Sequence, residues 1–146
     1  MLEEVLLLIE KYFEGKVDKA GKPYINHLLA VSEQVDSEED KIVALLHDII
    51  EDTYISIEEL NKVIPMNLIE RILLLTHDKK YTYDEYITNI LNCGDINVVR
   101  IKMADMWHNM DLSRLDIITQ NDVQRFQKYR GYYKKLEKKY IQMISR

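Results

Sequence analysis

Residues 45–53 hold an unusual density of side chains that can bind a metal or move a proton. His47 and Asp48 interrupt an otherwise apolar run. Glu51 and Asp52 follow four residues after them, so in a helix each pair shares a face, one turn apart. One rim would then present an imidazole and three carboxylates. Carboxylates this close repel one another, and a divalent cation would relieve the repulsion while also using the imidazole.

Two further segments place polar side chains where the helical pattern is otherwise apolar. His27 lies in the first, and Asp105 lies in the second, with Lys102 and Asn109 at helical spacing around it. Burying an unpaired carboxylate costs several kcal/mol, so these groups need a hydrogen-bond partner or a cation. Taken singly, His27 is more typical of a hydrogen-bonded core histidine, and Asp105 of a partner for Lys102.

Together the three segments supply two imidazoles and two carboxylates. The four residues are His27, His47, Asp48 and Asp105. Mixed nitrogen and oxygen ligands suit Mn²⁺, Fe²⁺, Zn²⁺, Ni²⁺ or Co²⁺ better than Ca²⁺, which prefers sites made of oxygen alone. The set therefore predicts a site for a divalent metal ion.

The elements that must position these groups are predicted to be helices, because the apolar spacing is helical almost throughout. Helices are expected near residues 2–13, 24–35, 38–51, 65–75, 82–92, 95–112 and 121–144, with a short one after Ser56. Ser37 and Thr82 have the pattern of helix N-caps. No clear strand emerges, so we expect an all-α fold of about eight helices and a single domain over residues 1–146.

The composition excludes several classes of protein. The 146 residues are 47% hydrophobic and 31% charged, which fits a globular domain with a real core. The lone Cys93 excludes an internal disulfide, and it lacks the neighbouring cation that would activate a nucleophile. No apolar run approaches the ~20 residues of a membrane span, and residues 5–9 lack the basic start of a signal peptide. We therefore expect a cytoplasmic protein without a membrane partner.

Charge is distributed unevenly along the chain. The formal net charge is −5, yet residues 121–146 hold eight Lys or Arg and two Asp or Glu. This last helix could meet a phosphate or a partner, but the favoured interpretation is a solvated face whose tyrosines and Leu136 pack inward. No base-reading motif accompanies it, and an acidic chain disfavours general nucleic-acid binding, so we expect no nucleic-acid partner.

Other aromatic and titratable residues are weaker candidates. His77 is interpreted as a surface or capping residue, and His108 as lining the site or pairing with a carboxylate. Trp107 is expected in the core. Three tyrosines could stack on a base, but their spacing is more typical of a helix packed on a core; they are Tyr81, Tyr83 and Tyr86.

The order of His27, then His47-Asp48, then Asp105 resembles the HD-domain phosphohydrolases. The strings "GKPYINHLLAV", "ALLHDIIEDT" and "IKMADMWHNM" are similar to the hydrolase domain of the RelA/SpoT alarmone enzymes. In addition, "YTYDEYI" and "HNMDLSRL", followed by a Tyr-rich basic helix, resemble small stand-alone members of that superfamily. The resemblance covers nearly the whole chain and leaves no room for a synthetase domain.

The resemblance implies a metal-dependent hydrolysis of the 3′-pyrophosphate of guanosine 3′,5′-bis-pyrophosphate (ppGpp) or a related nucleotide. The four residues named above would hold one ion, usually Mn²⁺ in these hydrolases. Glu51 and Asp52 would position and deprotonate the attacking water. Asn109 and Lys102 would face the substrate, and Lys19 falls where the family places basic residues that meet phosphates.

Two positions depart from the family pattern and keep alternatives open. Leu28 stands where the family commonly has Pro, and Met106 where it commonly has Arg. The second change removes a cation from the site, so an HD-type nucleotide 5′-phosphohydrolase is the alternative enzyme. A non-catalytic, metal-stabilised nucleotide-binding module is the alternative from another class, although the presence of both Glu51 and Asp52 argues against it.

Overall fold

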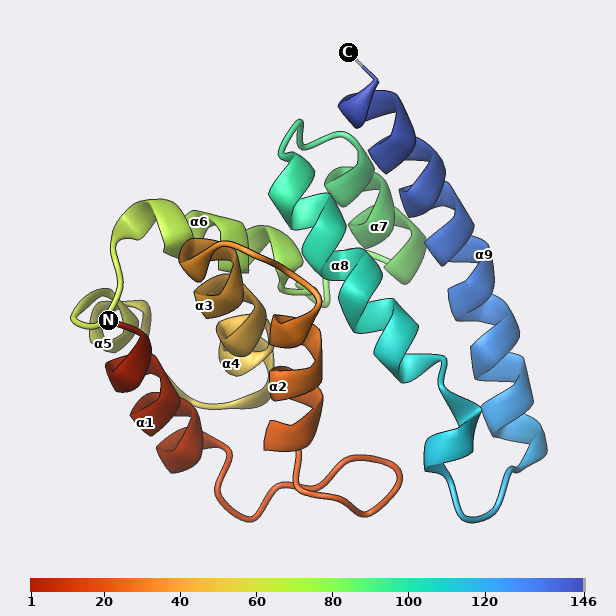
Figure 1. The fold of residues 1–146 in the computed structure, drawn as a ribbon, viewed down its shortest axis with the longest axis horizontal. Coiled ribbons are helices and arrows are strands. Elements are labelled where there is room, and N and C mark those ends of the chain that lie inside the picture. The colour runs from red at the N-terminus through yellow and green to blue at the C-terminus, as the bar shows by residue number, and fades with distance from the viewer. Residues whose placement is uncertain (146) are drawn as a thin grey trace.

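The computed structural model describes residues 1–145 as helices joined by loops, with a long one over residues 13–24 (Figure 1). The helices are α1 (Leu2–Tyr12), α2 (Ile25–Glu33), α3 (Glu38–Leu46), α4 (Ile49–Asp52), α5 (Ile57–Asn61), α6 (Met66–Leu75), α7 (Tyr83–Leu91), α8 (Ile96–Asn109), the 3₁₀ helix η1 (Leu112–Arg114) and α9 (Gln120–Ile144). Within residues 1–145 the only extended pairing is an isolated bridge between Val17 and Pro23. The predicted all-α fold is confirmed.

Helices α3 and α8 carry the centre of the core. The α3 residues Ile42 to Leu46 are all buried, and α3 packs against α1, α2, α6 and α8. Helix α8 is buried over most of its length and packs against α2, α3, α6, α7 and α9. Helix α9 runs along one side of the molecule, against α7 and α8 (Figure 1). Asp105 therefore lies on an enclosed helix, and His47 directly follows another.

Side-chain caps fix where several helices begin. The hydroxyl of Ser37 accepts a hydrogen bond from the backbone N–H of Asp40 at the start of α3. Thr82 and Glu85 form a reciprocal capping box at the start of α7. Asp95 caps α8 by accepting from the N–H groups of the first turn. These caps set the register in which α3 and α8 present polar side chains to the core.

The predicted helix over residues 38–51 is broken at His47, a difference from the sequence expectation. The Nδ1–H of His47 donates to the carbonyl of Ala44 at 2.6 Å, in competition with the backbone N–H that a continuous helix would place there. Asp48 adopts φ −103° and ψ −1°, and α4 then restarts, with the Asp52 N–H bonded to the Asp48 carbonyl. The break turns His47 inward and leaves Asp52 at the surface.

The loop between α1 and α2 is folded into a tight turn. Gly21 adopts φ +78°, a left-handed conformation that glycine reaches without strain. Oδ1 of Asp18 accepts from the backbone N–H groups of Ala20 and Lys22, at 2.9 and 3.0 Å. Lys19 therefore lies in a turn whose backbone is held by its neighbour.

Trp107 was expected in the core, and that prediction is wrong. Its side chain is 60% exposed, and its ring is tilted against the ring of Tyr133 at 5.9 Å between centroids. Helix α8 is apolar on most of its faces, so the sequence did not reveal which of them borders α9. Among the helices of residues 1–145, none combines the length and the apolar character needed to cross a membrane.

Candidate metal centre and active site

The two histidines and two aspartates predicted as metal ligands converge at one point of the core. Each offers one ligand atom, and these atoms lie within 4.8 Å of one another. His27 comes from α2, His47 and Asp48 from the junction of α3 and α4, and Asp105 from α8. His27 and His47 are each 1% exposed. A buried cluster of this composition can hold a divalent metal ion.

The donor atoms face one another at hydrogen-bond distances. Oδ1 of Asp105 lies 2.9 Å from Nε2 of His27 and 3.2 Å from Nε2 of His47. Oδ2 of Asp48 lies 3.1 Å from Nε2 of His47. The Nδ1–H bond of His47 to the Ala44 carbonyl directs its Nε2 into the cluster, which is the tautomer that a ligating histidine requires.

The charges of the cluster stabilise one another. Burial alone would lower the pKa of His47, but the carboxylates of Asp48 and Asp105 outweigh it and raise that pKa well above its ordinary value. Burial would raise the pKa of Asp105, but Lys102 and His47 hold it well below its usual range. Both aspartates therefore remain ionised, the state in which they bind a cation.

Lys102 and Asn109 surround the carboxylate of Asp105. Nζ of Lys102 donates to Oδ2 of Asp105 at 2.8 Å, and Nδ2 of Asn109 donates to Oδ1 at 3.1 Å. Lys102 is only 7% exposed, and its ammonium group lies 5.0 Å from the ring centroid of Tyr86. Two of the three predicted substrate contacts, Lys102 and Asn109, therefore border the cluster, but the ammonium of Lys102 is already paired with a candidate ligand.

The sequence left two roles open for His108, lining the site or pairing with a carboxylate, and in the structure it contacts a histidine of the cluster. Its Nδ1 lies 2.7 Å from Nδ1 of His27. Burial and the proximity of His27 lower the pKa of His108 to about 4, so its imidazole is neutral at pH 7. Because Nε2 of His27 faces Asp105, the neutral ring of His108 can accept the Nδ1–H of His27 and orient it.

Glu51 and Asp52 lie on the wall of a cavity of about 400 Å³ that opens beside the cluster. Burial, Asp48 and Glu51 together raise the pKa of Asp52 to about 6. Oε1 of Glu51 accepts from the backbone N–H of His77 at 2.8 Å. His77 thus borders the cavity, where the sequence left substrate contact as its less favoured role, and its backbone N–H anchors an acid.

Aromatic rings form the opposite wall of this cavity, which we call the metal cavity. The rings of His77 and Tyr86 stack at 4.8 Å, and those of Tyr83 and Tyr86 at 5.6 Å. The hydroxyl of Tyr86 donates to the Leu75 carbonyl. Tyr83 and Tyr86 therefore pack against one another and the core, as their spacing suggested, and also line the cavity. Tyr81 is 40% exposed and does not line it.

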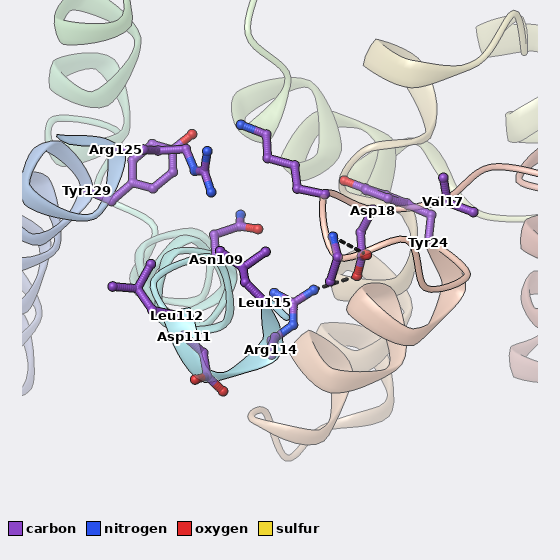
Figure 2. Close-up of a pocket in the computed structure, with 12 residues that line it drawn as sticks. Val17, Asp18, Tyr24, Asn109, Asp111, Leu112, Arg114, Leu115, Arg125 and Tyr129 are labelled. Atoms are coloured by element: carbon purple, nitrogen blue, oxygen red, sulfur yellow. Dashed lines mark hydrogen bonds and ion pairs between the residues drawn. The ribbon is translucent and has the colours of Figure 1, made fainter. Parts of the chain in front are cut away.

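A second cavity, of about 320 Å³, adjoins the first and shares Tyr24, Asn109 and Tyr129 with it (Figure 2). Lys19 lines this second cavity and not the metal cavity, and Arg125 of α9 lines it as well. The like charge of Arg125, together with burial as the larger cause, lowers the pKa of Lys19. Two cations at close range make this the part of the site suited to an anion.

The sequence interpretation missed several residues of the two cavities. The hydroxyl of Tyr24 donates to Oδ2 of Asp48, and its ring lies between the cavities, a role that its place three residues before His27 could have suggested. Helix α9 contributes Lys128 and Tyr129 to the metal cavity. The last helix does pack Leu136 and several tyrosines inward, but two of its basic residues, Arg125 and Lys128, line the cavities.

Comparisons with known proteins agree with this picture. No family model matches the chain. It is 31% identical over 122 residues to the bifunctional (p)ppGpp synthase/hydrolase SpoT of Escherichia coli K12, across 75% of this chain and 17% of that protein. The chain therefore spans only about a sixth of the length of SpoT.

A smaller relative matches over most of its own length. The chain is 32% identical over 127 residues to the zebrafish (Danio rerio) guanosine-3′,5′-bis(diphosphate) 3′-pyrophosphohydrolase MESH1, across 78% of this chain and 69% of that protein. A solved structure, described as a metazoan ortholog of SpoT that hydrolyzes ppGpp, superposes with a TM-score of 0.73 over 98% of this chain and 93% of that one, at 24% identity. The shared fold is the all-α HD type. The chain belongs to the family of HD-type guanosine-3′,5′-bis(diphosphate) 3′-pyrophosphohydrolases, as its resemblance to that family implied.

Proposed function

We propose that this chain is a metal-dependent phosphohydrolase that removes the 3′-pyrophosphate of ppGpp or a closely related nucleotide. The observation that carries the proposal is the buried cluster of two imidazoles and two carboxylates beside an acid pair, on the wall of a cavity that continues into a cationic one. SpoT and MESH1 are named for acting on this nucleotide.

The metal ligands in this proposal are His27, His47, Asp48 and Asp105. Their mixed nitrogen and oxygen donors fit Mn²⁺, with Fe²⁺, Zn²⁺, Ni²⁺ and Co²⁺ as ions of similar preference. When bound, such an ion supplies a Lewis acid for the phosphate and lowers the pKa of a water molecule from ~15.7 toward ~7.

Asp52 is the general base of the proposal. A base must lie beside the water and must be ionised near neutral pH, and a pKa of about 6 fits that requirement. Glu51, anchored by the backbone N–H of His77, keeps a second negative charge next to it and so helps to raise that pKa. The water proton passes to Asp52 as the oxygen attacks phosphorus.

The proposed reaction exchanges one phosphorus–oxygen bond for another. The water oxygen bonds to the phosphorus that carries the ribose 3′ oxygen, the bond between that phosphorus and the 3′ oxygen breaks, and the 3′ oxygen takes up a proton. The products from ppGpp are GDP and pyrophosphate. Negative charge that develops on the phosphoryl oxygens lies in the cavity lined by Lys102 and Lys128.

The rest of the substrate would occupy the second cavity. Asn109 and Tyr24 stand at the junction, where the ribose would lie, and Lys19 and Arg125 face the part beyond it. A cationic pocket is needed because a chain with a net charge of −5 repels a nucleotide at long range. The partner in this proposal is thus a small anionic nucleotide.

The test is to incubate the Mn²⁺-loaded protein with ppGpp and a panel of nucleoside triphosphates and to identify the products. We expect GDP and pyrophosphate from ppGpp, and their absence would refute the main proposal. Because the buried Met106 borders the metal cavity where the family commonly has Arg, the panel also scores release of phosphate or triphosphate from the 5′ position. That outcome would favour the 5′-phosphohydrolase, and tight binding without turnover would favour a binding module.

A further inference from the structure

We propose that the ion pair between Asp18 and Arg114 is a positioning pair for the second cavity, which sets the affinity for the nucleoside side of the substrate and takes no part in metal binding. This inference rests on the proposed function in one respect only, which is that part of the nucleotide occupies the second cavity.

Arg114 joins two segments that are distant in the sequence. Its Nη2 lies 2.6 Å from Oδ2 of Asp18, in the loop between α1 and α2 (Figure 2). Its Nη1 donates to the carbonyl of His108 at 2.9 Å. His108 immediately precedes Asn109, which lines both cavities. One guanidinium therefore fixes the distance between the Lys19 loop and the end of α8.

Asp18 uses its two oxygens for different purposes. Oδ1 accepts from the backbone N–H groups of Ala20 and Lys22 and so holds the turn, whereas Oδ2 binds Arg114. The side chain of Asp18 is only 8% exposed, which strengthens the pair relative to a solvated one. Burial would raise the pKa of Asp18, but hydrogen bonds from Lys22 and Arg114 lower it, so the carboxylate is charged at neutral pH.

The pair opposes a repulsion that is built into the cavity. Lys19 and Arg125 both line the second cavity and their like charges repel, an effect that Asp122 offsets only in part through its pair with Arg125 at 2.9 Å. The Lys19 loop is closed by backbone hydrogen bonds within itself, such as that from the Asp18 N–H to the Lys22 carbonyl at 2.8 Å, but its side chains are mainly exposed, so few of them hold it against the end of α8. Without the attachment to Arg114, the loop would open and Lys19 would leave the cavity.

Two substitutions separate the ion pair from the turn. Asp18→Asn retains an Oδ1 that can accept from Ala20 and Lys22 but removes the charge that faces Arg114. Arg114→Met removes the guanidinium and keeps an apolar stem. We expect each variant to raise KM for ppGpp and the Kd for GDP by about tenfold, because loss of one charged contact reorganises the loop. We expect kcat to stay within about twofold and Mn²⁺ affinity to be unchanged.

A double variant tests whether the two residues act as one unit. Asp18→Asn combined with Arg114→Met should bind GDP no more weakly than either single variant, within about twofold. Arg71→Met is the matched control, because Arg71 is also 24% exposed and pairs with Asp40 and Asp95 away from both cavities. It should lower the melting temperature without changing the KM for ppGpp or the Kd for GDP.

The outcomes distinguish this proposal from the proposed function. The positioning role would be overturned if KM and Kd were unchanged in both single variants. It would also be overturned if the variants lost Mn²⁺ affinity together with nucleotide affinity. A wild-type protein that binds GDP but does not hydrolyse ppGpp would refute the hydrolase alone, and GDP binding by the variants would still decide the role of the pair. A wild-type protein that binds neither nucleotide would refute both.

Discussion

The two cavities that meet at Tyr24 and Asn109 are built in different ways. Beside the metal cavity, the candidate ligands project from helices, are enclosed by the core, and are held by hydrogen bonds to one another. Around the second cavity, the charged groups come from a loop, from η1 and from α9. Asp18 and Arg114 form an ion pair between distant segments, and Arg125 pairs with Asp122 on the same helix. The positions of the metal ligands thus depend on the register of the packed helices. The positions of the charged groups around the second cavity depend on electrostatic contacts between distant segments.

This difference separates the expected effects of mutation. Changes beside the metal cavity should alter metal affinity or kcat, because the groups there contact the ion or the water. Changes around the second cavity should alter KM and leave the metal in place. If a substitution around the second cavity changed metal affinity, the two cavities would be energetically coupled.

The largest effect is expected from His47→Ala. The substitution removes one ligand and leaves Asp48 and Asp105 facing each other without the imidazole between them. We expect Mn²⁺ affinity to fall by at least about a hundredfold and turnover of ppGpp to be lost with it. Titration calorimetry measures the first effect and product analysis the second.

His77→Ala is the control for His47→Ala, because His77 borders the same cavity but is not part of the metal cluster. It should retain Mn²⁺. Full metal occupancy in the His47→Ala protein would remove His47 from the ligands.

Asp52→Asn should separate metal binding from chemistry. The amide has nearly the same shape but cannot accept the proton from water, so we expect kcat to fall by about 10²- to 10⁴-fold. Mn²⁺ affinity should change by less than about threefold, because Asp52 is not among the ligands. Exposed Glu14→Gln is a charge-matched control, and a normally active Asp52→Asn enzyme would refute the assignment of the base.

Tyr24→Phe removes the hydrogen bond to Asp48 while preserving the ring between the cavities. Partners that orient a ligand typically contribute about 10- to 100-fold in metal affinity, and we expect the lower end here. Tyr12→Phe is the matched control, since the hydroxyl of Tyr12 donates to Glu59, which is not part of the cluster. Equal Mn²⁺ affinity in the Tyr24→Phe and wild-type proteins would show that the Tyr24 hydroxyl is not needed to orient Asp48.

The smallest predicted effect is on pH dependence. Because the pKa of Asp52 is raised to about 6, its proton-accepting form is scarce at pH 5 and dominant at pH 7. At constant metal occupancy, kcat/KM should therefore rise about tenfold from pH 5 to pH 7. The rise should be absent from the residual activity of Asp52→Asn, and a flat profile in the wild type would contradict a base of this pKa.

The metal cluster could be predicted from the sequence because helical spacing is a local property. His27, His47, Asp48 and Asp105 each contradict an apolar helix pattern, and such conflicts point to buried polar groups that need one another. The all-α fold follows from the same periodicity. The break after Leu46 could not be predicted, because it arises from a hydrogen bond between the His47 ring and a backbone carbonyl that competes with helix formation.

The second cavity was largely hidden because its contacts are not local. Asp18 and Arg114 are 96 residues apart, and nothing in either segment marks the other as its partner. The basic character of α9 was visible, but which of its residues face α8 depends on how the helices pack. The same lack of information explains why Trp107 was wrongly assigned to the core and why Lys128 was overlooked.

The most direct test of the metal centre is a crystal structure of the Mn²⁺-soaked protein with anomalous diffraction data. We expect one strong anomalous peak within bonding distance of Nε2 of His27 and His47 and of a carboxylate oxygen of Asp48 and Asp105. A peak bound elsewhere, or no peak at a concentration of Mn²⁺ that supports turnover, would contradict the centre on which the proposed hydrolysis depends.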